Sequence, residues 1–173
     1  MDTTLGITLL GTGCPSVSTA RFGPANLVQC GSMKLLVDIG SGVTQRLLGC
    51  GANGAIIDAV LVTHIHTDHL VDLYQFIISS WHQNRDRKQV IYGPPGIKEL
   101  VESTMAVWRT ERELRIKWEK RSSLAAFEIE IHELDLVASG EALRSRDIGL
   151  LYVLGVNGQI LMHFAAMAGL AWP

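Results

Sequence analysis

The chain has 173 residues, enough for one domain with a hydrophobic core. It is 47% hydrophobic and 18% charged, as in soluble globular proteins, and its formal net charge of −2 gives no global electrostatic case for binding nucleic acid or a membrane. The three widely spaced cysteines predict reduced, buried thiols rather than a disulfide framework. The N-terminus lacks the basic region of a signal peptide, so we expect a cytoplasmic protein.

Apolar segments with strand character dominate the first third of the chain. Four of them are expected to pair in one sheet: residues 5–11, 25–31, 33–38 and 57–62. Between the third and fourth segments, Ser41 is expected to cap a short helix over residues 42–50, which Gly51 ends.

Helical periodicity follows in the middle of the chain. Helices are predicted directly after residue 69, over residues 96–108 and over residues 111–120. Further strands are expected at residues 89–93 and 125–137, between and after these helices. Strands that alternate with helices around a single core indicate an α/β layered fold.

The C-terminal segment, residues 138–173, has a different character. It contains two apolar runs around Asn157 and Gly158, which predict a β-hairpin over residues 150–165. A membrane span is the alternative, because no Asp, Glu, Lys or Arg occurs after Asp147. The polar and glycine residues in the middle of the segment favour the hairpin, so no membrane partner is expected.

The stretch THIHTDHLVDL, residues 63–73, is rich in side chains that can bind a metal ion. On an extended backbone His64 and His66 point the same way, so both imidazoles can reach one cation. Asp68 and His69 follow where the chain turns toward a helix, and they can face a second point nearby. Imidazole nitrogen and carboxylate oxygen are zinc ligands. Two metal ions close together can bind the attacking and the leaving oxygen of a hydrolysis. A histidine-rich polar loop without metal is the alternative interpretation.

Four segments together resemble a known family: LLGTGCPS, LLVDIGSG, VLVTHIHTDHLVDL and VIYGPPG. They are similar to the N-terminal half of metallo-β-lactamase-fold hydrolases, and especially to the ribonuclease Z-like group, which includes arylsulfatase-like and phosphodiesterase members. The resemblance covers residues 5–137 and implies an α/β fold, the αββα sandwich, with a two-zinc site at one edge of its sheets. It implies one domain over residues 1–173 that is truncated and contains mainly the first half of the sandwich.

The resemblance also implies roles for individual residues. His64 and His66 would bind one Zn²⁺, and Asp68 and His69 would serve the second. Asp68 would also orient or deprotonate the attacking water as the catalytic residue. Asp38 would fix the tautomer of a metal-binding histidine from the second shell of contacts. The alternative for Asp38 is a carboxylate that caps the turn after its strand.

The remaining ligands of the family have no clear counterpart here. The family's later histidine, its bridging aspartate in a Gly-Asp pair and its last histidine are all missing at the expected places. His132 is retained as a weak metal-ligand candidate, and His163 as a weaker one. We therefore expect a truncated or divergent member that binds up to two Zn²⁺ weakly and hydrolyses poorly.

The implied activity is zinc-dependent hydrolysis of phosphodiester bonds at RNA 3′ ends, or of small sulfate or phosphate esters. Residues 109–121 hold six basic and three acidic residues, and Arg85, Arg87 and Lys88 form a smaller basic cluster. Both are interpreted as solvated faces rather than phosphate tracks, which favours a small ester over RNA. The alternative function is a non-catalytic binding module or decayed gene fragment. A homodimer through exposed apolar surface is also expected.

Overall fold

A single mixed sheet organises the first 134 residues. The computed structural model describes residues 4–13 and 15–134 with their side chains, and the backbone of residues 140–144, 148–154 and 160–166. The strands of the large sheet, in spatial order, are β1 (Leu5–Gly11), β2 (Ala25–Cys30), β3 (Met33–Val37), β4 (Ala59–Leu61), β5 (Gln89–Gly93) and β6 (Ile129–Glu133). The first three strands are antiparallel, and β3 to β6 run parallel. The predicted α/β class and the predicted pairing of the first four strands in one sheet are confirmed.

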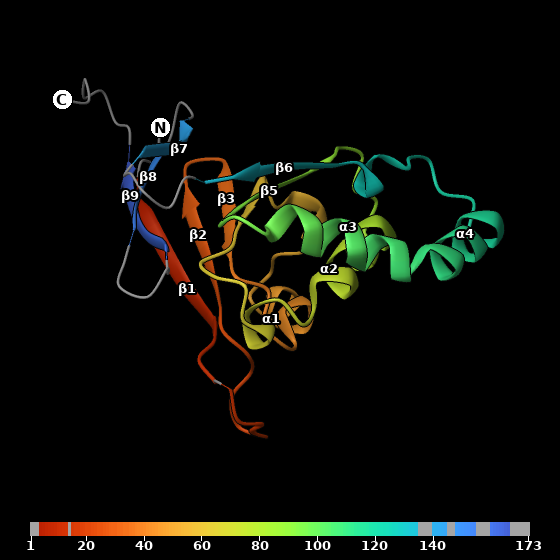
Figure 1. Ribbon diagram of the computed structural model, residues 1–173, viewed down its shortest axis with the longest axis horizontal. Coiled ribbons are helices and arrows are strands. Elements are labelled where there is room, and N and C mark those ends of the chain that lie inside the picture. Colours follow the sequence, from red (N-terminus) through yellow and green to blue (C-terminus); the bar gives the residue numbers. More distant parts are fainter. Residues whose placement is uncertain (1–3, 14, 135–139, 145–147, 155–159, 167–173) are drawn as a thin grey trace.

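Helices cover one face of this sheet. The α-helices are α1 (Val43–Gly49), α2 (Leu73–His82), α3 (Ile97–Val107) and α4 (Arg109–Trp118), and three single 3₁₀ turns are η1 (Gly54–Ile56), η2 (Thr67–His69) and η3 (Ala125–Phe127). Figure 1 shows α1, α2 and α3 gathered on one side of the sheet, whereas α4 extends away from it. In the part of the chain that the structure describes, every α-helix precedes β6 in the sequence.

The start of α1 differs from the sequence prediction. The residue that caps the helix is Gly42, with φ of 79°, and Ser41 makes no side-chain cap. The carboxylate of Asp72 takes this role, because it accepts a hydrogen bond of 2.6 Å from the Gly42 N–H. The prediction for Ser41 was wrong because the capping oxygen comes from a residue thirty positions later, which local sequence does not reveal.

Two other predictions need correction. The segment predicted as a strand over residues 125–137 begins with the turn η3, and only Ile129–Glu133 pairs with β5 as β6; its end lies outside the described residues. Cys30 is buried as expected, but Cys50 is exposed at the end of α1, so the prediction of a buried thiol is wrong there.

The two faces of the sheet bury different sets of side chains because successive residues of a strand point to opposite sides. Leu36 and Val60 face α1 and α2 in the main core, whereas Leu35 and Leu61 belong to a second cluster on the opposite face. On the edge strand β1, alternate apolar residues stay exposed: Leu5, Ile7 and Leu9. Such a stripe is a candidate for self-association, which stays a prediction.

The C-terminal strands form a separate antiparallel sheet of β7 (Gly140–Arg144), β8 (Ile148–Leu154) and β9 (Ile160–Ala166). The two apolar runs of the predicted hairpin are β8 and β9, whose register runs from Leu154 opposite Ile160 to Ile148 opposite Ala166. The Asn157–Gly158 turn itself lies outside the described residues. Within the described part of the chain, no helix is both long and apolar enough to cross a membrane.

A buried arginine joins the α2–β5 connection to the segment before β4. Arg85 is only 1% exposed. Its guanidinium donates hydrogen bonds to five backbone carbonyl oxygens: Gly54, Ala55, Ile57, Arg87 and Lys88. Burial lowers the pKa of Arg85 to about 10, so the side chain is still charged at neutral pH. The interpretation of a solvated basic cluster is therefore wrong for Arg85, which instead satisfies backbone acceptors inside the fold.

Replacing Arg85 should therefore destabilise the protein strongly. We expect Arg85→Met to lower the free energy of unfolding by about 3 kcal/mol or more, because several buried carbonyl groups lose their donors. The matched control is Arg87→Met, since the Arg87 side chain is 48% exposed and pairs with Asp58 at 3.0 Å; its expected cost is below about 1 kcal/mol. Urea unfolding measures both, and equal costs would contradict this account.

Candidate metal centre

The histidine motif leaves the sheet as an extended chain and then makes one tight turn. β4 ends at Leu61, and His66 has extended backbone angles (φ −71°, ψ 146°) before η2 begins at Thr67. Because His64 and His66 are two apart on extended backbone, their rings lie on the same side. His64 Nε2 is 3.1 Å from His66 Nδ1. The sequence predicted that neither histidine lies in an α-helix, and the structure confirms this.

The turn η2 brings the second half of the motif back to the first. The ring centroids of His64 and His69 are 4.1 Å apart. Asp68 Oδ2 lies 3.7 Å from His69 Nε2. The structure thus gathers His64, His66, Asp68 and His69 at the end of β4. Their metal-binding roles remain a prediction.

The carboxylate of Asp38 supports this cluster through hydrogen bonds. It directly follows β3, is 4% exposed and has a positive φ of 61°, which a non-glycine residue adopts only when its surroundings impose it. Its carboxylate accepts hydrogen bonds from His69 Nδ1 (2.7 Å), from the Thr63 N–H (2.8 Å) and from Thr63 Oγ1 (2.8 Å). Asp38 therefore contacts the motif itself, so capping a turn is not its only contact.

Thr63 was not identified from the sequence, although it directly precedes the first histidine. Its hydroxyl has one hydrogen, which it donates to Asp38, and it also lies 2.9 Å from His64 Nδ1. Because a carboxylate can only accept, the hydroxyl must accept from His64 Nδ1–H. His64 Nε2 then carries a lone pair, which faces His66 Nδ1 at 3.1 Å, and neutral His69 carries one on Nε2 because its Nδ1 donates to Asp38. One buried carboxylate thus sets the tautomers of two histidines.

The same contacts separate the pKa values of these two histidines. The hydrogen bond to Asp38 raises the pKa of His69 above its ordinary value of 6.5, against the opposing effect of burial. Burial, followed by the neighbouring His69 and His66, lowers the pKa of His64. Because the folded pKa of His69 lies above the unfolded one, its contact with Asp38 stabilises the fold fully below about pH 6.5. That contribution is lost as the pH rises through the raised pKa.

The weaker ligand candidates lie apart from the cluster. His132 is on β6, two strands from β4, where its ring stacks on Tyr92 at 4.6 Å and its Nε2 is 2.7 Å from Glu130 Oε1. These contacts give no support to a metal-binding role for His132. The side chain of His163, on β9, lies outside the described residues.

The donor types of the cluster suit Zn²⁺, but the ligand set is short. Two nitrogens on one tetrahedral zinc at about 2.0–2.1 Å are separated by ~3.3 Å, close to the 3.1 Å between His64 Nε2 and His66 Nδ1. Within the described residues, however, no group of three or more His, Cys, Asp or Glu side chains is placed to hold a metal ion. The described residues therefore supply a matched pair of imidazoles rather than a complete catalytic set.

Space for water or an anion lies beside Asp68. A cavity of about 100 Å³ is lined by Asp68, Ser41 and the loop that contains Arg21. This loop reaches the cluster because Gly23 and Gly40 pack backbone against backbone, so closely that a Cβ on Gly40 would lie 2.5 Å from the carbonyl carbon of Gly23. The cavity can hold a few water molecules next to the predicted catalytic carboxylate.

Removing the Thr63 hydroxyl should release the tautomer of His64. We expect Thr63→Val to give a mixture of Nδ1–H and Nε2–H forms at His64, while the wild-type protein holds the Nδ1–H form. The matched control is Thr67→Val, because Thr67 lines a cavity on the other side of the loop. Histidine side-chain ¹⁵N chemical shifts report the tautomers, and an unchanged His64 spectrum in Thr63→Val would refute the assigned relay.

Known proteins resemble most of this chain. The family model for the anti-Pycsar protein Apyc1 matches residues 5–133. Ribonuclease Z of Mycobacterium bovis (strain BCG / Pasteur 1173P2) is 45% identical over 104 residues, which are 58% of this chain and 37% of that protein. Ribonuclease Z of Mycobacterium marinum is 38% identical over 130 residues, or 73% and 46% of the two chains. The chain thus spans less than half the length of these curated relatives.

Solved structures give the fold. Human tRNase Z, short form, superposes with a TM-score of 0.73 at 20% identity, covering 92% of this chain and 63% of that one. The metallo-β-lactamase fold protein YhfI of Bacillus subtilis follows with a TM-score of 0.63 at 18% identity, covering 93% and 57%. This chain therefore has the metallo-β-lactamase fold, is a homologue of roughly the N-terminal half of ribonuclease Z, and belongs to the anti-Pycsar protein Apyc1 family.

Proposed function

We propose that this protein is a zinc-dependent hydrolase of phosphodiester or related ester bonds, and that residues 63–69 form the first part of its metal site. The observation that carries the proposal is the buried Asp38 carboxylate, which acts on His69 directly and on His64 through Thr63 and so places the lone pair of each neutral imidazole on Nε2. Membership of the family and relatives named ribonuclease Z support the reaction class.

The proposed roles follow from the contacts. His64 and His66 would hold one cation through the nitrogens that face each other, and His69 Nε2 with Asp68 would hold the second. Bound Zn²⁺ supplies an acidified water and polarises an ester oxygen. Asp38 and Thr63 keep the imidazoles in the required tautomers. Asp68, at the small cavity, can accept the proton of a water that enters there.

The charge pairing in the basic segment, residues 109–121, favours a small ester over an extended RNA. In the basic segment that contains α4, Arg115 pairs with Glu111 and Glu119, and Arg121 pairs with Glu119. Cations held by neighbouring carboxylates are less available to a phosphate backbone. This supports the interpretation of residues 109–121 as a solvated face and small phosphate esters as the substrate class.

A non-catalytic binding module is the second candidate. The observation in its favour is that the described residues include no group of three or more side chains placed around one metal position. Catalytic zinc usually has three protein ligands, and the proposed positions have two each. Metal binding separates the two candidates directly.

Zinc affinity should depend on the motif and on no other histidine. We expect His66→Ala and Asp68→Ala each to weaken Zn²⁺ binding at least tenfold, because each removes one of two protein ligands from its cation. His132→Ala is the matched control, since its ring is engaged by Tyr92 and Glu130, and it should change the affinity less than twofold. Competition with a chelating dye measures all three. Equal losses in His66→Ala and His132→Ala, or no binding at all, would contradict the proposed site.

Hydrolysis by the 173-residue chain alone should be slow. With Zn²⁺ added, we expect turnover of bis-p-nitrophenyl phosphate near the rate without protein, because two protein ligands per cation leave the attacking water poorly aimed. The absorbance of the released p-nitrophenolate gives the rate. Zinc-dependent turnover that disappears in His66→Ala would show that further ligands complete the site, and our description of a short ligand set would then be wrong.

A further inference from the structure

Two arginine side chains line one cavity beside the loop between β1 and β2. Figure 1 shows this loop beyond the end of the large sheet, beside α1. The cavity has a volume of about 290 Å³ and is lined by residues 9–12 at the end of β1, by residues 20–22 of the loop and by Arg46 of α1. It is separate from the small cavity at Asp68, although Arg21 borders both.

The guanidinium of Arg46 is held in place by two contacts. Its Nε donates a hydrogen bond of 2.9 Å to the Leu10 carbonyl oxygen at the end of β1. Its Cζ lies 5.4 Å from the centroid of the Phe22 ring, which is a cation–π contact. Among the described residues, the Nη groups of Arg46 have no hydrogen-bond or carboxylate partner. A guanidinium that is fixed while its remaining N–H donors stay available is suited to bind an oxyanion.

The wall that carries Phe22 is fixed as well. The Gly13 N–H donates a hydrogen bond of 2.7 Å to the Phe22 carbonyl oxygen across the loop. A Cβ on Gly11 would lie 1.9 Å from the carbonyl oxygen of Gly23, so the two ends of the loop pack backbone against backbone. A Cβ on Gly42 would lie 2.0 Å from Phe22 Cδ1, so the ring lies directly on the backbone before α1. The wall of the cavity is thus in place before a ligand binds.

Arg21 adds a second positive charge to the cavity. Within the described part of the chain, Arg21 has no carboxylate partner, and none of the lining residues is Asp or Glu. Two like charges at one cavity repel each other, and a bound anion relieves this repulsion. A phosphate monoester carries a charge of about −1.5 to −2 at pH 7, which matches two guanidinium groups. A carboxylate or a phosphodiester carries one negative charge and would match only one of them.

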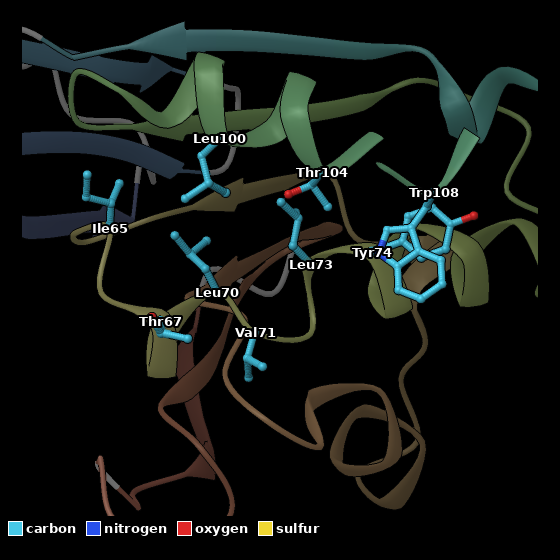
Figure 2. A pocket seen from close by; sticks show the side chains of 9 residues that line it. All are labelled: Ile65, Thr67, Leu70, Val71, Leu73, Tyr74, Leu100, Thr104 and Trp108. Carbon is cyan, nitrogen blue, oxygen red and sulfur yellow. The ribbon is translucent and has the colours of Figure 1, made fainter. Parts of the chain in front are cut away.

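Another cavity of similar size has a different lining. Figure 2 shows the cavity of about 310 Å³ on the other side of the histidine loop, with Tyr74 and Trp108 at one end. No Asp, Glu, Lys or Arg is among the described residues that line it. An anion would lose its hydration there without gaining a charged partner. The two arginines therefore distinguish the cavity beside the β1–β2 loop as the place for an anion.

We propose that the cavity at Arg21 and Arg46 binds the dianionic phosphate group of a phosphate monoester, apart from the candidate metal centre. Arg46 donates hydrogen bonds to the phosphate oxygens from its free N–H groups, and Arg21 supplies the second charge. Leu9 and Phe22 offer apolar surface to the carbon part of the ester. Inorganic phosphate carries the same group. The site goes beyond the proposed function, because it needs neither a metal ion nor the histidine motif.

Phosphate binding by the metal-free protein tests the proposal. In NMR titrations at constant ionic strength, we expect inorganic phosphate to cause saturable shifts at residues around the cavity. Arg46→Met and Arg21→Met should each weaken binding at least tenfold, because each removes one of two charged partners. Arg109→Met is the matched control, since it removes the same charge from a side chain that is 71% exposed and does not line the cavity. It should change the affinity less than twofold.

Arg21→Met also covers the case in which Arg46→Met disturbs folding, because the hydrogen bond to Leu10 belongs to Arg46. Methyl phosphate that binds as tightly as inorganic phosphate would assign the site to an organic monoester. Binding of inorganic phosphate alone would assign it to the free ion, and both results support a site for the dianion. Dimethyl phosphate, which has the single charge of a nucleic-acid backbone phosphate, should bind at least tenfold more weakly.

Three results would overturn the proposal. The first is equal phosphate affinity in the wild type, Arg21→Met and Arg46→Met. The second is equal affinity for dimethyl phosphate, and the third is an equal loss of affinity in Arg109→Met.

The position of the anion is separable from the metal centre. His66→Ala should leave phosphate affinity within twofold, because His66 does not line the cavity. Phosphate binding that is lost in His66→Ala and kept in Arg46→Met would place the anion at the candidate metal centre. That result would contradict the arginine site and leave the proposed hydrolase standing.

Discussion

The site depends on one buried carboxylate. Asp38 directly follows β3 with a positive φ, and burying its charge is costly unless its oxygens are hydrogen-bonded. Thr63, at the end of the neighbouring parallel strand, and His69, six residues later, supply those hydrogen bonds. A backbone contact joins the same two segments: the Ile39 N–H donates a hydrogen bond of 2.7 Å to the His69 carbonyl oxygen. The histidine loop therefore closes over Asp38 as part of the fold, and its ring nitrogens are oriented before any ligand arrives.

Because the histidine loop begins as extended backbone, its side chains lie on two opposite sides. Alternate side chains point in opposite directions, so His64 and His66 face each other while Ile65 faces the larger cavity. The turn η2 then places Asp68 at the small cavity and returns His69 to Asp38. A chain of six residues thus carries nitrogen and oxygen donors on one side and an apolar wall on the other.

The sequence pattern predicted those features that depend on residues close together in the chain. The apolar runs before His64 form β3 and β4, and the spacing HxHxDH placed two imidazoles on one side of an extended chain. Both features follow from periodicity along the backbone. Residues whose partners come from elsewhere in the fold were missed. Asp72 caps α1 from thirty positions along the chain, and Arg85 donates hydrogen bonds to carbonyl groups of a turn that is distant in the sequence. Thr63 has its role only because the fold places Asp38 beside it.

The central claim is that the residues oriented by Asp38 bind Zn²⁺ through nitrogen and oxygen. Zinc K-edge X-ray absorption of the zinc-titrated protein tests it most directly, since it reports the ligand atoms themselves. We predict a first shell of nitrogen and oxygen at about 2.0–2.1 Å with imidazole scattering, which is lost when His64 and His66 are both replaced by alanine. A sulfur shell at about 2.3 Å, or a spectrum that is the same without the two histidines, would contradict the account.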